Sequence, residues 1–98
     1  MSQTIIATLK INEGSEAEFE AAATEMMAAV AANEPGCLLY ELSRSDDPQT
    51  YFFMERYVDA DAVAAHGSTD HMKAFGAKIG GCLAGRPEIV RGAPVVED

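Results

Sequence analysis

The 98-residue sequence predicts an α+β fold with the element order β-α-β-β-α-β. Stretches rich in β-branched and aromatic residues alternate along the chain with stretches whose apolar residues recur at helical spacing. The two central strand-like stretches are separated by a short polar segment, which predicts an antiparallel hairpin. The length suits one hydrophobic core, so we expect residues 1–98 to form a single domain.

The first strand is predicted at residues 4–11 (TIIATLKI), because β-branched residues dominate it. Ser15 and Glu18 then have the spacing of a capping box, in which each side chain bonds a free backbone N–H. A helix is expected to run to about Ala32, where the sequence NEPG at residues 33–36 ends it. Its apolar stripe consists of Phe19, Ala22, Ala23, Met26 and Val30.

The second and third strands are predicted at residues 37–44 (CLLYELSR) and 50–57 (TYFFMERY), joined by the turn SDDPQ. Asp59 is expected to cap a short helix that ends at His66, before a glycine. Ser68 can cap the next helix. The apolar stripe of that helix consists of Met72, Phe75, Ile79 and Leu83.

The last strand is predicted within residues 86–96, where Pro94 places the stretch at a sheet edge or outside the ladder. This order of elements is the ferredoxin-like pattern, with one antiparallel sheet and its helices on one face.

The two central strands are unusual because they are apolar on both faces. A half-solvated antiparallel strand should alternate apolar with polar residues. In the third strand we expect Tyr51, Phe53 and Tyr57 to point one way and Phe52 and Met54 the other. In the second strand we expect Leu38, Tyr40 and Leu42 to lie opposite Cys37 and Leu39. Two helices can cover only one face, so a second copy of the chain is expected on the other, in a two-fold homodimer. The alternative is a ligand-binding sheet face in a monomer.

Composition excludes several classes of partner. A formal net charge of −9 repels phosphate backbones and anionic lipid, so neither nucleic acid nor membrane is an expected partner. No apolar run approaches the roughly 20 residues that span a bilayer, and the first residues do not read as a signal peptide. Cys37 and Cys82 form no C-x-x-C motif, which suits free thiols in the cytoplasm.

His66 and His71 are the only histidines. Residues five apart on a continuous helix point about 140° apart, whereas metal-binding helices use i, i+4 spacing, so no metal site is expected. The sequence also lacks a glycine-rich phosphate loop of dinucleotide type, and we expect no cofactor. Either histidine could line the space between helices and sheet. The alternatives are that His66 interacts with the last carbonyls of its helix and that His71 packs on Phe75 at i+4.

Glu55, Tyr57 and Tyr40 are further candidates for a site. Glu55 lies among apolar residues of the third strand, where it either pairs with an arginine across strands or orients a histidine or a substrate hydroxyl. The tyrosines are either core residues or donors to a ligand at a pocket edge. The arginines that could pair with Glu55 are Arg44, Arg86 and Arg91.

The stretches EPGCLLYEL and DDPQTYFFMERYVDADAVAAHGSTDHMKAF resemble the antibiotic biosynthesis monooxygenase (ABM) domain family. The family pattern has E-x-G before the second strand, then Y-E, D-P, E-x-W/Y, D-x-x-A and H-x-x-x-x-H-F/Y/M. The match covers nearly the whole chain, with GRPEI fitting the final turn. The resemblance implies a dimeric α+β barrel with a pocket between sheet and helices in each subunit.

The resemblance leaves three activities to weigh. Some members oxidise hydroquinones or polycyclic phenols with O₂ and no cofactor, some degrade haem, and some isomerise a small phosphorylated dione. The absence of Trp and of an Asn in the first strand disfavours haem degradation. The segment DAVAAH keeps the isomerase as an alternative, and a non-catalytic ligand-binding dimer also stays open.

We therefore expect a cofactor-independent monooxygenase that acts on a quinol or polyphenol-type aromatic. His66 is the expected base. His71 and Glu55 are the other expected catalytic residues, in orienting or hydrogen-bonding roles. The expected substrate contacts are Tyr57, Tyr40 and Arg86.

Overall fold

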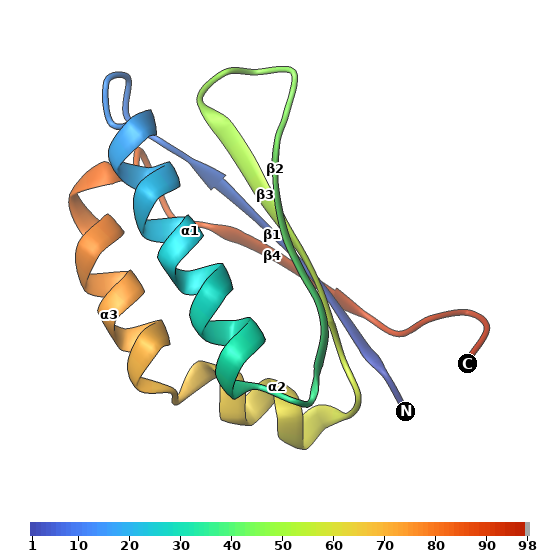
Figure 1. Cartoon of the computed structure of the whole chain (residues 1–98). Coiled ribbons are helices and arrows are strands. Elements are labelled where there is room, and N and C mark those ends of the chain that lie inside the picture. The colour runs from blue at the N-terminus through green and yellow to red at the C-terminus, as the bar shows by residue number, and fades with distance from the viewer. Residues whose placement is uncertain (98) are drawn as a thin grey trace.

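The computed structural model describes residues 1–97 and contains one four-stranded antiparallel sheet with the strand order β2-β3-β1-β4 (Figure 1). The predicted order of strands and helices is confirmed. The strands are β1 (Gln3–Lys10), β2 (Cys37–Arg44), β3 (Thr50–Tyr57) and β4 (Glu88–Gly92). The helices are α1 (Glu16–Asn33), α2 (Ala60–Gly67), α3 (Asp70–Ile79) and the 3₁₀ turn η1 (Gly80–Cys82).

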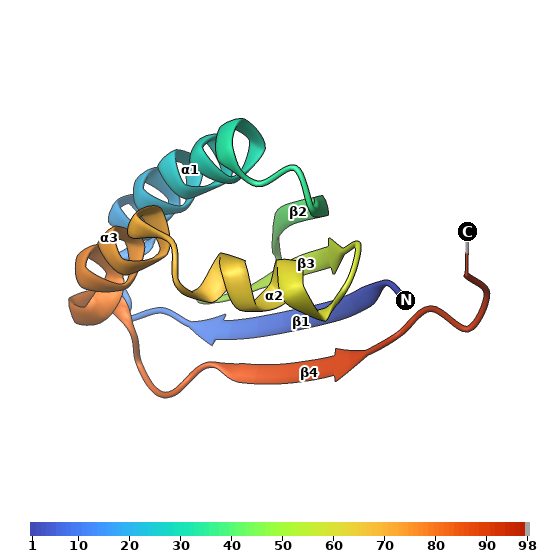
Figure 2. The ribbon, with the colours of Figure 1, turned by 90° about the horizontal axis from the view of Figure 1, so that it is seen from below.

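All three α-helices lie on the same side of the sheet, with α1 beside α3 and α2 near the start of β1 (Figure 2). The predicted stripe of α1 is buried, and so are Phe75 and Ile79 of α3. These side chains meet the inner face of β1 and β3, which contributes Leu9, Tyr51 and Phe53. This layer is the core, and the candidate site lies beside it.

Two of the predicted helix caps are wrong. Ser15 is the N-cap of α1 but makes no side-chain cap bond, so the capping box with Glu18 does not form. Glu16 instead accepts a bond from the N–H of Gly14, 2.6 Å away, where φ is +92°. That backbone conformation suits glycine because it lacks a Cβ. At α3 the cap is Thr69, whose hydroxyl accepts from the Met72 N–H, and not the neighbouring serine.

β2 contains a register shift that changes its two faces. The pairing with β3 slips between Cys37 and Leu39, which places one extra residue in β2. Cys37, Tyr40 and Leu42 therefore pack toward the core. Leu38 is 55% exposed, so its predicted grouping with Tyr40 and Leu42 on one face is wrong.

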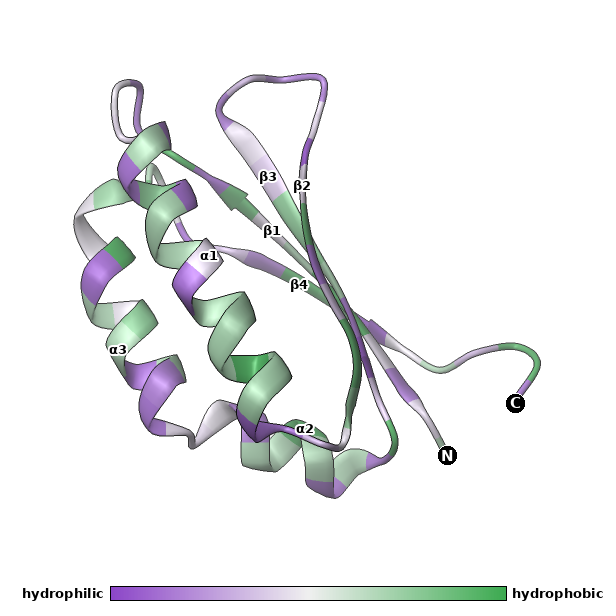
Figure 3. Cartoon of the chain, viewed as in Figure 1, coloured by the Kyte–Doolittle hydropathy of each residue, from purple (hydrophilic) through white to green (hydrophobic). Residues whose placement is uncertain are grey.

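The outer face of the sheet carries an apolar patch that no helix within residues 1–97 covers, as predicted. The face is not apolar throughout, because Glu41, Arg56 and Glu88 also lie on it. Ile6 of β1 pairs with Met54 and with Val90, which places all three on this face. Val90 is 64% exposed, while Met54 is half-buried. Figure 3 shows apolar (green) stretches along the strands as well as on the helices.

β4 is shorter than predicted, since Pro94 and its neighbours fall outside the ladder. Among the described helices none has the length and apolar character to cross a membrane.

Candidate functional site

A cavity of about 390 Å³ lies between the inner face of the sheet and the helices α2 and α3. Its volume lies in the range of small-molecule sites. Most of its wall is apolar, and it includes Ala7, Leu9, Phe53, Met72, Phe75 and Ile79. Its polar side chains are Tyr40, Glu55, His66 and Arg91. A mostly apolar pocket with a few convergent polar groups is the usual form of a site for a small organic ligand.

His66 lies on the last turn of α2, and its side chain is only 9% exposed. Asp59 fixes the start of this helix by accepting a bond from the Ala62 N–H at 2.9 Å, as predicted. The imidazole packs against the rings of Tyr40 and Tyr57, with centroids 5.2 and 5.4 Å away. These contacts hold the ring against the cavity.

Glu34, the residue that follows α1, fixes which nitrogen of His66 is bonded. The Nδ1 atom lies 2.9 Å from Glu34 Oε1 and 3.1 Å from Oε2. A carboxylate only accepts hydrogen bonds, so Nδ1 carries the hydrogen. Nε2 is then the acceptor nitrogen, and no side chain within residues 1–97 bonds it. The ring therefore presents a free lone pair, as a general base requires.

Glu34 was not selected by the sequence reasoning, although its side chain is only 8% exposed. The signal available was its position as the Glu of the E-x-G motif. The motif glycine has a geometric role, because a Cβ added at Gly36 would lie 2.8 Å from the Cβ of Ala62. This close approach allows α2 to pack on the loop after α1. It thereby brings His66 within reach of Glu34.

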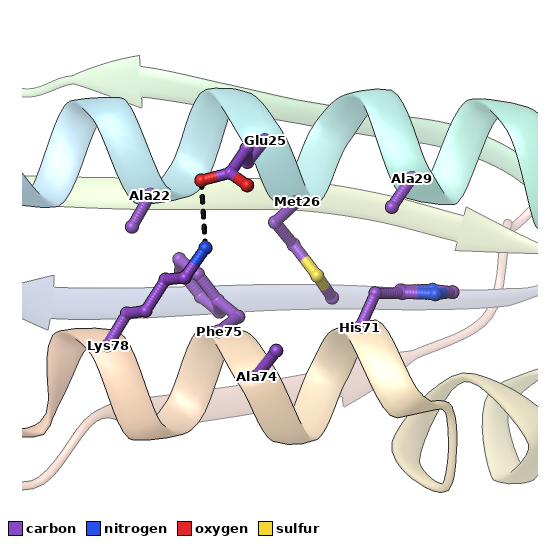
Figure 4. Close-up of a pocket in the computed structure, with 8 residues that line it drawn as sticks. All are labelled: Ala22, Glu25, Met26, Ala29, His71, Ala74, Phe75 and Lys78. Carbon is purple, nitrogen blue, oxygen red and sulfur yellow. Dashed lines mark hydrogen bonds and ion pairs between the residues drawn. The ribbon is translucent and has the colours of Figure 1, made fainter.

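His71, in the first turn of α3, contacts the same carboxylate from the other side. Its Nε2 lies 2.5 Å from Glu34 Oε2, and its side chain is 18% exposed. It lines a separate hollow of about 90 Å³ between α1 and α3, and not the main cavity. Figure 4 shows His71 at one end of this hollow, with the ion pair between Lys78 and Glu25 at the other. The structure thus joins the two histidines through Glu34.

Glu55 lies on β3 and also lines the cavity. Its Oε1 accepts a bond from the hydroxyl of Tyr57 at 2.6 Å. Burial raises the pKa of the Glu55 carboxyl, while the Tyr57 bond and the nearby charges of His66 and Arg91 act in the opposite direction. Tyr57 is fully buried, and burial followed by its bond to Glu55 raises the pKa of its hydroxyl. It supports Glu55 and is not among the residues that line the cavity.

Arg91 lines the cavity, whereas Arg86 is exposed and does not. Ile5 of β1 pairs with both Glu55 and Arg91, which places the two charged residues on one face, two strands apart. Within residues 1–97 Glu55 forms no ion pair, and Arg44 pairs with Glu20 at 2.6 Å.

Tyr40 borders the cavity from β2. Burial, followed by the charge of Glu55, raises the pKa of its hydroxyl. It therefore remains a neutral donor at physiological pH. No three His, Cys, Asp or Glu side chains in the described part of the chain are grouped so as to hold a metal ion.

Comparison with known proteins identifies the family. Residues 2–78 match the family model "Antibiotic biosynthesis monooxygenase". The chain shares 42% identity with a Caulobacter crescentus CB15 protein provisionally named an antibiotic biosynthesis monooxygenase, at a TM-score of 0.94 over 97% of this chain and 91% of that one. Rv0793 from Mycobacterium tuberculosis has the same fold, with 24% identity and a TM-score of 0.90 over 99% of this chain and 98% of that one. The sequence matches none of the curated proteins with which it was compared. The chain belongs to the antibiotic biosynthesis monooxygenase family.

Proposed function

We propose that this protein is a cofactor-independent monooxygenase that oxidises a hydroquinone or polyphenol-type aromatic with O₂. The observation that carries the proposal is the free Nε2 of His66 at an apolar cavity, with Nδ1 held by the buried Glu34. That arrangement suits removal of one proton from a hydroxyl in a space with little water.

The proposed reaction begins when His66 Nε2 takes the proton of a substrate hydroxyl. The resulting phenolate is electron-rich and passes one electron to O₂, and the two radicals then join to form a C–O bond at a ring carbon. Loss of the hydrogen on that carbon breaks the O–O bond, releases water and leaves a carbonyl. The balance is one hydroquinone and one O₂ giving one hydroxyquinone and one water.

The other polar residues have separate proposed roles. Tyr40 donates its hydroxyl hydrogen to the developing phenolate, because its raised pKa keeps it protonated. Glu55, held by Tyr57, accepts a bond from a second substrate hydroxyl. Arg91 stabilises the negative charge of the phenolate once it has formed, and it takes the place of Arg86 as the arginine expected to contact the substrate.

A homodimer joined through the outer sheet face is part of the proposal. The apolar side chains of Ile6, Met54 and Val90 support it, since no helix in the described part of the chain shields them. Cys37 and Cys82 form no disulfide, which suits the proposed cytoplasmic location.

The rival activity is isomerisation of a small phosphorylated dione, and Arg91 is the observation that favours it. A phosphate would bind an arginine at the cavity. Arg91 is, however, the only arginine or lysine among the described residues that line the cavity. One positive charge suits a phenolate better than a dianionic phosphate.

Oxygen uptake distinguishes the candidates. We expect saturable O₂ consumption with naphthohydroquinone, with one O₂ consumed for each hydroxyquinone formed. His66→Ala should lower turnover by at least about 10²-fold, the usual effect of losing a general base. The control is Lys73→Ala, an exposed substitution on α3, which should leave the rate unchanged. Turnover of a phosphorylated dione without O₂ uptake would establish the isomerase. Tight binding of quinols without turnover would instead indicate a ligand-binding module.

A further inference from the structure

Glu34 bonds both histidines, and this arrangement indicates a path for the proton that His66 takes from the substrate. His66 Nδ1 and His71 Nε2 contact one carboxylate at 2.9 and 2.5 Å. The exposed fraction of the side chain is 9% for His66, 18% for His71 and 8% for Glu34. They form a connected, largely buried chain of hydrogen bonds.

The two ends of this chain face different spaces. His66 lines the 390 Å³ cavity, and His71 lines the 90 Å³ hollow between α1 and α3. Phe75 is the only described residue that lines both, and its ring is buried. The cluster therefore links the substrate cavity to a second surface that the substrate does not occupy.

The charges around the cluster favour one imidazolium and not two. From β2 and β3 the facing groups are Cys37, Tyr40, Tyr57 and Glu55. Burial raises the pKa of Cys37 to about 11 and also raises the pKa values of both tyrosines, so these three groups stay neutral. Near His71 the charges of Glu25 and Lys78 pair with each other at 2.8 Å. The charge of Glu55 is opposed by that of Arg91 on the same sheet face. Glu34 at the centre therefore balances one positive charge, and a second imidazolium would add an unbalanced charge in a buried place.

We propose that the two histidines share one proton charge across Glu34, so that His71 releases a proton to solvent when His66 takes one from the substrate. The inference rests on the proposed role of His66 as base. The substrate hydroxyl proton moves to His66 Nε2, and His71 loses the hydrogen of its Nδ1 to water. Glu34 stays a carboxylate, and the net charge of the cluster does not change. His71 acts through Glu34 and does not touch the substrate.

Nuclear magnetic resonance of the histidine ring nitrogens tests the shared charge without any substrate. At neutral pH we expect the wild-type spectrum to show one charged ring, His71, and one neutral ring, His66, which carries its hydrogen on Nδ1. In His71→Gln the amide can still donate to Glu34 but holds no exchangeable charge. The charge should then appear on His66. Two charged rings or two neutral rings in the wild type, or a His66 spectrum unaltered in His71→Gln, would overturn the proposal.

Turnover adds a test that separates this inference from the function. With naphthohydroquinone, His71→Gln should be slowed by about 10-fold, less than the effect expected for loss of the base. Free imidazole should restore its rate, and Lys73→Ala should match the wild type. Loss of activity in His66→Ala, combined with a normal rate in His71→Gln, would reject the exit path alone. Normal rates in both variants would reject the base assignment.

Discussion

Replacing Gly36 with alanine tests how the site is assembled. The new Cβ would lie 2.8 Å from the Cβ of Ala62 and 3.4 Å from a methyl of Val58. Carbon atoms prefer about 3.5–4.0 Å, so α2 has to move away by roughly 1 Å. Overpacking of this kind costs about 1–3 kcal/mol.

The same movement pulls His66 away from Glu34. A shift of about 1 Å stretches their 2.9 Å contact beyond hydrogen-bond distance. We expect Gly36→Ala to lower the Tm by about 4–24 °C for a chain of this length. Turnover should fall by about 10²-fold, as small displacements of catalytic groups do. Scanning calorimetry and O₂ uptake measure the two effects.

Gly80→Ala is the matched control. A Cβ at Gly80 meets nothing within 4 Å, and its φ of −51° and ψ of −41° suit alanine. It should leave stability unchanged or raise it by up to about 1 kcal/mol. If Gly36→Ala has the same Tm and the same turnover rate as Gly80→Ala, then close packing of α2 on the loop does not set the position of His66.

Three further predictions concern Glu55, the outer face and Glu34. Burial raises the pKa of Glu55 above its unfolded value, so the folded state binds more protons and stability falls as pH rises through the folded pKa. Glu55→Gln should therefore raise the Tm at pH 7 but not at pH 4, and equal effects at both would contradict the burial argument. In light scattering we expect the wild-type protein to have a mass near twice 10.4 kDa and Ile6→Lys to have the mass of a single chain. A wild-type mass of a single chain would reject the dimer. Glu34→Gln should lower turnover by about 10-fold or more with little change in KM, because it removes the charge that stabilises the imidazolium; an unchanged kcat would show that this charge is not used.

The sequence predicted the parts of the fold that depend on periodicity. Phe19, Met26 and Val30 recur at helical spacing, and each is buried on α1. The β2–β3 hairpin follows in the same way from two β-branched and aromatic runs joined by a short turn. Periodicity failed at β2, because one extra residue near Leu38 exchanges the faces of the strand and composition does not mark it.

Both histidines were named from the sequence as candidate site residues, but Glu34, which joins them, was not. Glu34 follows α1 and precedes Pro35, where a polar residue is ordinarily solvated. Its burial depends on α2 and α3, which come more than 25 residues later. Arg91 was missed as a cavity residue for a similar reason: its place beside Glu55 arises from the pairing of β1 with two strands.

The contacts among Glu34, His66 and His71 also affect the local unfolding of the protein. Each of these residues comes from a different helix or its end, and the contacts join positions 32 and 37 apart in the chain. Detaching α2 alone would leave a buried carboxylate short of a partner, at a cost of about 1–3 kcal/mol or more. The end of α1, α2 and the start of α3 should therefore exchange their amide hydrogens as one cooperative unit. The amide hydrogens of α2 would then exchange more slowly than those of an isolated helix of eight residues.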